Sequence, residues 1–168
     1  MENTFQIGMV LFPKLTQLDL TGPFEVLSRV PGTKIHLLWK EVTPIRADSG
    51  LTIMPTLDFT SCPKLDMLFI PGGPGQKDLM EDQEVLQFLR TQGAQCEFVT
   101  SVCTGALVLG AAGLLEGYQA TTHWAARPLL ANFGAEPTEK RVVWDRNRIT
   151  GGGVTAGIDF ACQIVAHK

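Results

Sequence analysis

The chain has 168 residues, of which 45% are hydrophobic and only 18% are charged, so it supplies ample apolar surface for a core and intrinsic disorder is excluded. This length predicts a single domain that spans residues 1–168. With 14 basic and 17 acidic residues the net charge is −3, and without a basic stripe to neutralise phosphates we expect no nucleic-acid binding.

Apolar runs alternate with amphipathic runs along the chain, which is typical of an α/β fold with a mainly parallel sheet. Residues 5–12 predict a buried first strand. A short helix over 24–29 follows, with Thr21 as a candidate cap and Pro23 near its start. Residues 34–40 predict a second strand.

The middle of the chain predicts strands that end in unusual residues. After an irregular region with a possible short strand over 51–54, residues 67–70 form a fully apolar strand followed by Pro-Gly-Gly-Pro-Gly. Residues 82–92 carry apolar side chains at helical spacing. The next strand, 97–102, runs directly into Cys103.

The last third of the chain predicts three helices and a hairpin. Residues 104–115 are apolar nearly all round, which indicates a buried helix, and 127–133 predict a short one. A strand pair is expected over 141–150, before a final helix over 155–166. We assign the buried face of that helix to Ile158, Ala161, Cys162 and Val165.

Membrane and secretory signals are absent from the sequence. The longest run of apolar residues and glycine, 105–115, is far shorter than the roughly 20 residues of a membrane span. No basic residue precedes Lys14, so a signal peptide is not expected. The four cysteines form no CxxC pair, which favours a reducing, cytoplasmic setting. Three of them are expected to be structural: Cys62, Cys96 and Cys162.

Three predicted strand ends carry residues suited to chemistry: Asp19, the pair Gly72-Gly73, and Cys103. In an open parallel sheet the carboxyl ends of the strands line the ligand crevice, so we expect these residues to converge. Cys103 lies between a strand and a helix with Gly105 close behind, as in a nucleophile elbow. The helix start would lower the pKa of the thiol and favour a nucleophilic thiolate. The alternative is a small buried apolar residue.

The other candidates also have two interpretations each. Asp19 is either a proton donor, with a pKa raised by a neighbouring thiolate, or a helix cap. Gly72 and Gly73 either donate amides to an anionic intermediate or form a flexible turn. His123 is either a base or a structural histidine. Gly151-Gly152-Gly153 is not a dinucleotide fingerprint, and neither a P-loop nor a His/Glu metal cluster occurs in the sequence.

The order and spacing of four motifs resemble the PfpI/ThiJ superfamily, which is related to class I glutamine amidotransferases. The resemblance implies a flavodoxin-like three-layer sandwich, and members are commonly homodimers. The motifs are IPGGPG at 70–75, SVCTGA at 101–106, TTHW at 121–124 and TGGGVTAGIDFA at 150–161.

Within the superfamily, residues 17–27 and the Cys-Thr pair are similar to the isonitrile hydratases. That likeness implies a lyase that hydrates a small-molecule isonitrile (R–N≡C) to an N-substituted formamide, with no metal or organic cofactor. The matching catalytic positions are Cys103, Asp19 and Thr104. Cys103 would form a thioimidate while Asp19 moves protons. Substrate or charge would be held by Gly72, Gly73 and His123.

The sequence also departs from the wider superfamily. Thr104 stands where its proteases carry a histidine, which argues against a peptidase, and Asp19 stands where other members carry a glutamate. The chain ends at Lys168, sooner than isonitrile hydratases usually do, so a C-terminal segment is expected to be missing. The alternatives are a sensor domain of an AraC-type regulator and a glyoxalase-like or redox-responsive protein. Phe24, Trp124 and Val154 are candidates for the substrate pocket.

Overall fold

A computed structural model describes residues 4–167 of the chain and contains one large sheet. Its strands are β1 (Phe5–Val10), β2 (Thr33–Trp39), β5 (Leu57–Asp58), β6 (Met67–Ile70), β7 (Phe98–Val102), β10 (Val142–Asp145) and β11 (Arg148–Gly151). Their spatial order is β10-β11-β7-β6-β1-β2-β5. Every neighbouring pair is parallel except β10 and β11, which form an antiparallel hairpin. The predicted α/β fold with a mainly parallel sheet is confirmed.

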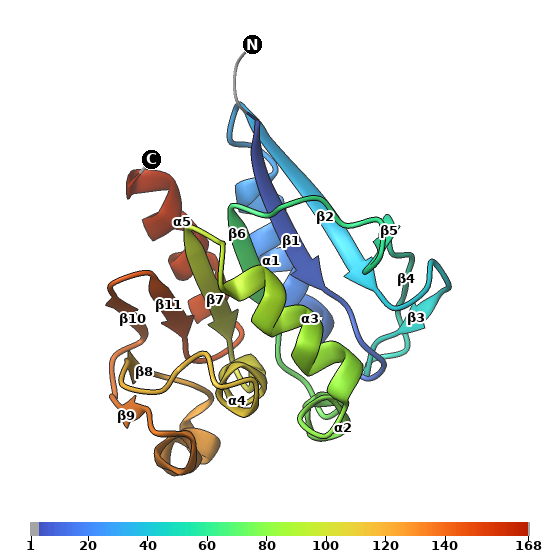
Figure 1. Cartoon of the computed structure of the whole chain (residues 1–168). Helices are drawn as coiled ribbons and strands as arrows, with labels where there is room; N and C mark the ends of the chain where they lie inside the picture. The colour runs from blue at the N-terminus through green and yellow to red at the C-terminus, as the bar shows by residue number, and fades with distance from the viewer. Residues whose placement is uncertain (1–3, 168) are drawn as a thin grey trace.

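Helices cover both faces of this sheet and make the predicted three-layer sandwich (Figure 1). The helices are α1 (Gln17–Leu27), α2 (Gln76–Leu79), α3 (Gln83–Gly93), α4 (Gly105–Ala111), α5 (Ala156–His167) and the 3₁₀ helix η1 (Trp124–Phe133). In Figure 1, α3 lies in front of the sheet and α1 behind it, and α1 packs against α5. Two small sheets pair β3 (Ile45–Arg46) with β4 (Thr52–Ile53), and β8 (Gln119–Ala120) with β9 (Glu136–Pro137).

The central strands are apolar because helices cover them on both sides. All residues of β6 and β7 are buried. Phe69 of β6 packs against Phe160 of α5, with ring centroids 5.8 Å apart. The arrowheads of β1, β2 and β7 point to one edge in Figure 1, so the segments that follow these strands meet there.

The first helix differs from the prediction. It begins at Gln17, with Thr16 at the cap position, so Pro23 lies inside it and Thr21 is not a cap. Gly22 and Pro23 do not mark the start of the helix, because both residues lie inside it and pack against α5. A Cβ on Gly22 would lie 3.2 Å from Ile158 of α5, and one on Gly157 would lie 3.3 Å from Pro23. Gly22 and Pro23 therefore stand where α1 and α5 cross closely.

Of the four residues predicted for the buried face of α5, only Ala161 is buried. Cys162 is exposed, and Ile158 and Val165 are partly exposed, with exposed fractions of 40% and 37%. The face that packs inward instead contains Phe160 and Ile164. The contact of Phe160 with Phe69 of β6 turns this face toward the sheet, so Cys162 and Val165 lie on the outer side of the helix.

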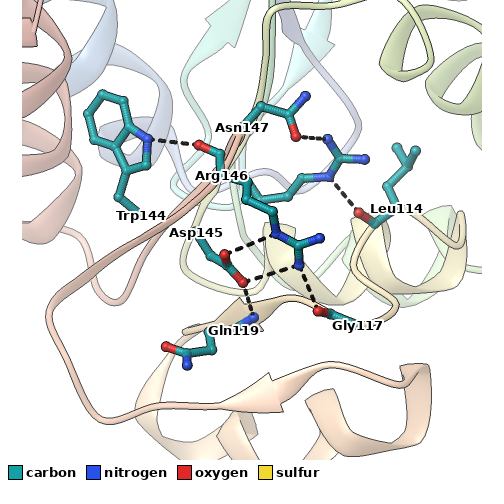
Figure 2. A network of polar contacts seen from close by, with 8 residues as sticks. Leu114, Gly117, Gln119, Trp144, Asp145, Arg146 and Asn147 are labelled. Carbon is teal, nitrogen blue, oxygen red and sulfur yellow. Dashed lines mark hydrogen bonds and ion pairs between the residues drawn. The ribbon is translucent and has the colours of Figure 1, made fainter.

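The hairpin predicted over 141–150 is confirmed, and a polar network fixes its tip (Figure 2). The Asp145 carboxylate accepts from the amide of Gln119 at 2.8 Å and from Nε of Arg146 at 3.2 Å. Nη2 of Arg146 donates to the carbonyl of Gly117 at 2.8 Å, and its guanidinium lies 3.8 Å from the ring centre of Tyr118. These contacts tie the tip to the loop that precedes β8.

Arg148 extends the same network toward the end of α4. Its Nε donates to the carbonyl of Leu114 at 2.6 Å and its Nη1 to Oδ1 of Asn147 at 2.8 Å. The guanidinium lies 4.6 Å from the ring centre of Tyr118, on which Arg146 also packs. Two arginines therefore share one aromatic ring, and the loop and the hairpin hold each other in place.

Candidate active site

Cys103 occupies a sharp turn between β7 and α4. Its φ is +52°, a left-handed conformation that costs a non-glycine residue energy and has to be held by its surroundings. The Cys103 amide donates to the carbonyl of Gly151 at 3.0 Å, and the Thr122 hydroxyl donates to the Cys103 carbonyl at 2.6 Å. A Cβ on Gly105 would lie 2.3 Å from the carbonyl oxygen of Ile70. The strand–turn–helix geometry of a nucleophile elbow is therefore present.

The glycine loop after β6 lies directly against this elbow. A Cβ on Gly72 would lie 2.7 Å from the Cβ of Cys103 and from the amide nitrogen of Thr104, so glycine is required there. The Gly72 carbonyl accepts from the amide of Thr16 at 2.8 Å, at the start of α1. The Gly73 amide donates to Oγ1 of Thr104 at 3.0 Å. The loop therefore joins α1 to the elbow, and the Gly73 amide is already used.

Asp19 lies in the first turn of α1 and is fully buried. Neither carboxylate oxygen has a hydrogen-bond partner of standard geometry, although the Cys103 thiol and the Gly72 amide lie close enough to lower its pKa in part. Burial is the larger effect and raises the pKa of Asp19 from 3.8 to about 6. Because Thr16 holds the cap position, the alternative role of Asp19 as a cap is wrong.

The thiol of Cys103 does not have the low pKa that the sequence suggested. Burial and the negative charge of Asp19 raise its pKa to about 12, and the amide of Thr104 lowers it only in part. The helix that follows starts only at Gly105 and ends at Ala111, so its effect is small against the loss of water around the sulfur. At neutral pH the pair therefore holds one proton, on the sulfur, beside an ionised Asp19.

His123 is half-buried at the start of η1 and serves as its cap. Its Nδ1 accepts from the amide of Ala125 at 3.3 Å, which places the proton of the neutral ring on Nε2. The ring lies against Trp124 with centroids 5.6 Å apart. The charged form of His123 lowers the pKa of Asp19, so the imidazole lies within electrostatic reach of that carboxyl.

A cavity of about 250 Å³ lies beside the elbow. Its walls are residues 121–124, Arg127, residues 139–141 and residues 152–156. Two wall residues connect the cavity to the backbone of Cys103. The Thr122 hydroxyl donates to the Cys103 carbonyl, and Gly152 follows Gly151, whose carbonyl accepts from the Cys103 amide. Of the three residues predicted for the substrate pocket, Trp124 and Val154 line this cavity, and Phe24 is not among its wall residues.

The structure thus brings Asp19, Gly72, Gly73, Cys103 and Thr104 together at one sheet edge and places His123 at the pocket beside them. Sequence analysis missed Thr122 and the basic residues of the pocket wall. Their positions depend on how η1 and the segment after β9 pack together, and no local motif marks that packing.

The remaining cysteines have no comparable surroundings. Burial raises the pKa of Cys62 to about 11 and that of Cys96 to about 12, which agrees with structural roles for these two residues. Among residues 4–167, no three His, Cys, Asp or Glu side chains gather as metal ligands would. Within the same range, no helix has the length and apolar character needed to cross a membrane.

Comparison with known proteins places this geometry in a family. The DJ-1/PfpI family model matches residues 6–167. The chain is 56% identical over 159 residues to isonitrile hydratase of Pseudomonas putida, covering 95% of this chain and 70% of the relative. It is 29% identical to the HTH-type transcriptional regulator GbdR of Pseudomonas aeruginosa, covering 99% of this chain and 47% of the regulator.

A solved structure is similar along nearly the whole chain. A ThiJ/PfpI family protein from Pseudomonas syringae superposes with a TM-score of 0.95 at 50% identity. The match covers 97% of this chain and 68% of that protein. From the family model and these identities, the chain belongs to the DJ-1/PfpI family.

Proposed function

We propose that this chain is an enzyme that hydrates isonitriles to N-substituted formamides, with Cys103 as the nucleophile and Asp19 as the proton carrier. The 56% identity to an isonitrile hydratase over 95% of the chain supports the reaction. The observation that carries the mechanism is the buried pair itself. The Asp19 carboxylate lacks hydrogen-bond partners of standard geometry and lies beside a thiol that keeps its proton.

The first step adds the thiol across the isonitrile carbon. That carbon carries a lone pair, so it accepts a proton and is then attacked by a nucleophile at the same atom. Asp19 takes the proton of Cys103 and delivers it to the carbon as the C–S bond forms. The S–H bond breaks, one C–H and one C–S bond form, and the product is the thioimidate R–N=CH–S–Cys103.

The second step is hydrolysis of the thioimidate. Water attacks the carbon while Asp19 takes one of its protons and passes it to the nitrogen, which gives R–NH–CH(OH)–S–Cys103. As this intermediate collapses to R–NH–CHO, the C–S bond breaks, and Asp19 transfers the hydroxyl proton to the sulfur of Cys103. The sum is R–N≡C plus water giving R–NH–CHO, so no oxidant or reductant is needed.

The neighbouring residues have positioning and binding roles in this proposal. Thr104 accepts from the Gly73 amide, and Gly72, which has no side chain, lets the Cβ of Cys103 and the amide of Thr104 lie against the loop. These contacts keep the glycine loop at a fixed distance from the reacting pair. His123 stands at the pocket wall with its proton on Nε2, and we assign it to the substrate.

The experiment that tests the function measures formamide from a simple alkyl isonitrile by chromatography. We expect product from the wild type and a loss of at least about a thousandfold for both Cys103→Ala and Asp19→Asn, since each removes one partner of the proton transfer. Thermal melts check that both variants fold. Full activity of Cys103→Ala would exclude the covalent mechanism, and no activity in the wild type would exclude the hydratase.

A sensor domain of a transcription regulator is the second candidate. Its support is the 29% identity to GbdR over 99% of this chain. A sensor would bind an isonitrile or another small ligand without turnover, so the same assay separates the two functions. The redox-responsive alternative is disfavoured, because burial raises the pKa of the Cys103 thiol and the neutral thiol is slow to oxidise.

We also propose that residues 1–168 form one domain and that the protein is a cytoplasmic homodimer. The described cysteines are all free, as a reducing compartment favours. Leu18 of α1 and Ile158 of α5 are exposed by 43% and 40%, and a second copy would cover this apolar surface. Light scattering coupled to size-exclusion chromatography tests the dimer, and a monomeric mass at micromolar concentration would contradict it.

A further inference from the structure

We infer that the pocket beside the elbow binds a carboxylate on the substituent of the isonitrile, so the preferred substrates are anionic isonitriles. This inference rests on the proposed hydratase function and adds the class of substrate. It depends on the charge of the pocket wall, on polar atoms in that wall without partners, and on the place of the cavity next to Cys103.

The pocket wall is positively charged although the whole chain has a net charge of −3. Arg127, Lys140 and Arg141 line it against one carboxylate, Glu139. Arg141 is already engaged by Asp159, with which it forms an ion pair outside the pocket wall. The charges that remain for a ligand are therefore those of Arg127 and Lys140.

Arg127 is only weakly engaged by the protein. Its Nη1 lies 3.8 Å from Glu139, whose side chain is 92% exposed, so this ion pair contributes little. Its Nε is buried and has no hydrogen-bond partner in the part of the chain that the structure describes. A buried donor without a partner is uncommon in folded proteins, so the protein itself does not satisfy this guanidinium. The planar guanidinium matches the two oxygens of a carboxylate.

Thr121 provides a second polar group in the same wall. The residue is fully buried, and its hydroxyl oxygen has no hydrogen-bond partner among residues 4–167. Its amide donates to Oγ1 of Thr150 at 2.9 Å, which holds the residue in place. A hydroxyl of this kind can donate to a carboxylate that Arg127 holds. An apolar substituent would leave both Thr121 and Arg127 without partners.

The size and place of the pocket fit a short substituent. About 250 Å³ corresponds to a small ligand rather than a drug-sized one, which needs roughly 300–1,000 Å³. Trp124 is 74% exposed and offers an apolar ring at the wall for the carbon chain of the substituent. The cavity reaches Thr122, which bonds the Cys103 carbonyl, so the isonitrile end lies toward the elbow.

The test compares isocyanoacetate with its methyl ester and with a neutral alkyl isonitrile of matched length. For the wild type we expect kcat/KM to be at least about tenfold higher for the carboxylate, since the ester and the alkyl isonitrile lack the charge-assisted contact with Arg127. Arg127→Gln is expected to remove this preference, so that the carboxylate and its ester react at rates within about twofold of each other. Arg127→Lys should restore part of it. The matched control is Arg29→Gln, an exposed arginine paired with Glu25 at the end of α1.

The outcomes separate this inference from the hydratase function itself. Equal rates for acid and ester in the wild type, or an unchanged preference in folded Arg127→Gln, would overturn the anionic pocket and keep the hydratase. If no isonitrile reacts, calorimetry with N-formylglycine decides. Binding that Arg127→Gln abolishes would support the carboxylate site, and no binding to the wild type would overturn it. Should Arg127→Gln fail to fold, Lys140→Gln replaces it in both assays, and an unchanged preference for the carboxylate in that variant would overturn the inference.

Discussion

Two turns of this molecule hold a non-glycine residue in the left-handed conformation beside an aspartate, and they treat polar groups in opposite ways. At the hairpin tip Arg146 has a φ of +55°, and Asp145, Arg146 and Arg148 all have hydrogen-bond partners (Figure 2). At the elbow Cys103 has a φ of +52°, and neither oxygen of the buried Asp19 has a partner of standard geometry. The tip therefore stabilises the fold, whereas the elbow retains an aspartate whose burial raises its pKa.

The number of hydrogen-bond partners of a charged group distinguishes the reactive turn from the structural one. Several hydrogen-bond partners hold a charged group in place and shift its pKa so that the charged form is favoured. The lowered pKa of Asp145 is an example. A buried carboxyl without them has a raised pKa, and so it can accept and release a proton near neutral pH. The same contrast separates Arg148, which has two acceptors, from Arg127, whose Nε has none among the described residues.

The largest expected effect on stability is at Asp19. Its pKa is about 6 in the folded chain against an ordinary value of 3.8, so folding takes up a proton between these values and stability falls as the pH rises through that window. Above pH 6 the buried carboxyl is ionised in the folded chain, and this lowers the free energy of unfolding. Asp19→Asn removes the charge and should raise the free energy of unfolding by up to about 3 kcal/mol. Urea unfolding at about pH 7.5 and pH 4 measures it, and the gain should vanish at the lower pH. A loss of stability at neutral pH would show that the carboxylate is well solvated or paired.

The next effect concerns the pH dependence of the reaction. Asp19 has to be ionised to take the proton of Cys103, so kcat/KM should rise with pH and level off above the pKa of Asp19, about 6. Below that value the rate should fall about tenfold per pH unit. Steady-state rates across the range in which the chain stays folded check this. A flat profile through pH 6, or a rise that follows a thiol near neutral pH, would contradict it.

The smallest effect is at the hairpin tip. Asp145→Ala removes the acceptor of the Gln119 amide and one partner of Arg146, which should lower the free energy of unfolding by about 1 kcal/mol, because a single hydrogen bond contributes about that much. Activity should stay within about twofold, since the tip lacks the unpaired groups of the elbow. Denaturant unfolding and the formamide assay together measure this, and a large loss of activity would mean that the tip positions the pocket.

The fold could be predicted from the sequence where the signal is local. The apolar run at β6 was predicted with its observed ends, and the turn residues around Asp145 gave the hairpin. The elbow could be predicted because a strand, Cys103 and Gly105 follow one another in the chain. These features depend on neighbours in sequence, and so propensity and pattern are enough.

The remainder depends on contacts between distant segments. The local sequence places Pro23 near a helix start, whereas it lies inside α1, where α5 packs against it. No local pattern in the sequence indicates this contact between the two helices. The pKa of Cys103 was predicted in the wrong direction because burial around the sulfur comes from packed elements, whereas the helix start is visible locally. Arg127 was missed for the same reason, since η1 meets residues 139–141 only in the folded chain.

The most direct test of the Asp19–Cys103 pair is a carboxyl titration of Asp19 by carbon-13 NMR, with thiolate absorbance in the ultraviolet followed on the same sample and Asp19→Asn used for assignment. The structure predicts a carboxyl that titrates at about 6 and a Cys103 that stays a thiol through neutral pH. A carboxyl that titrates near 3.8 would contradict the raised pKa of Asp19, and a Cys103 thiolate already present at neutral pH would contradict a proton held on the sulfur.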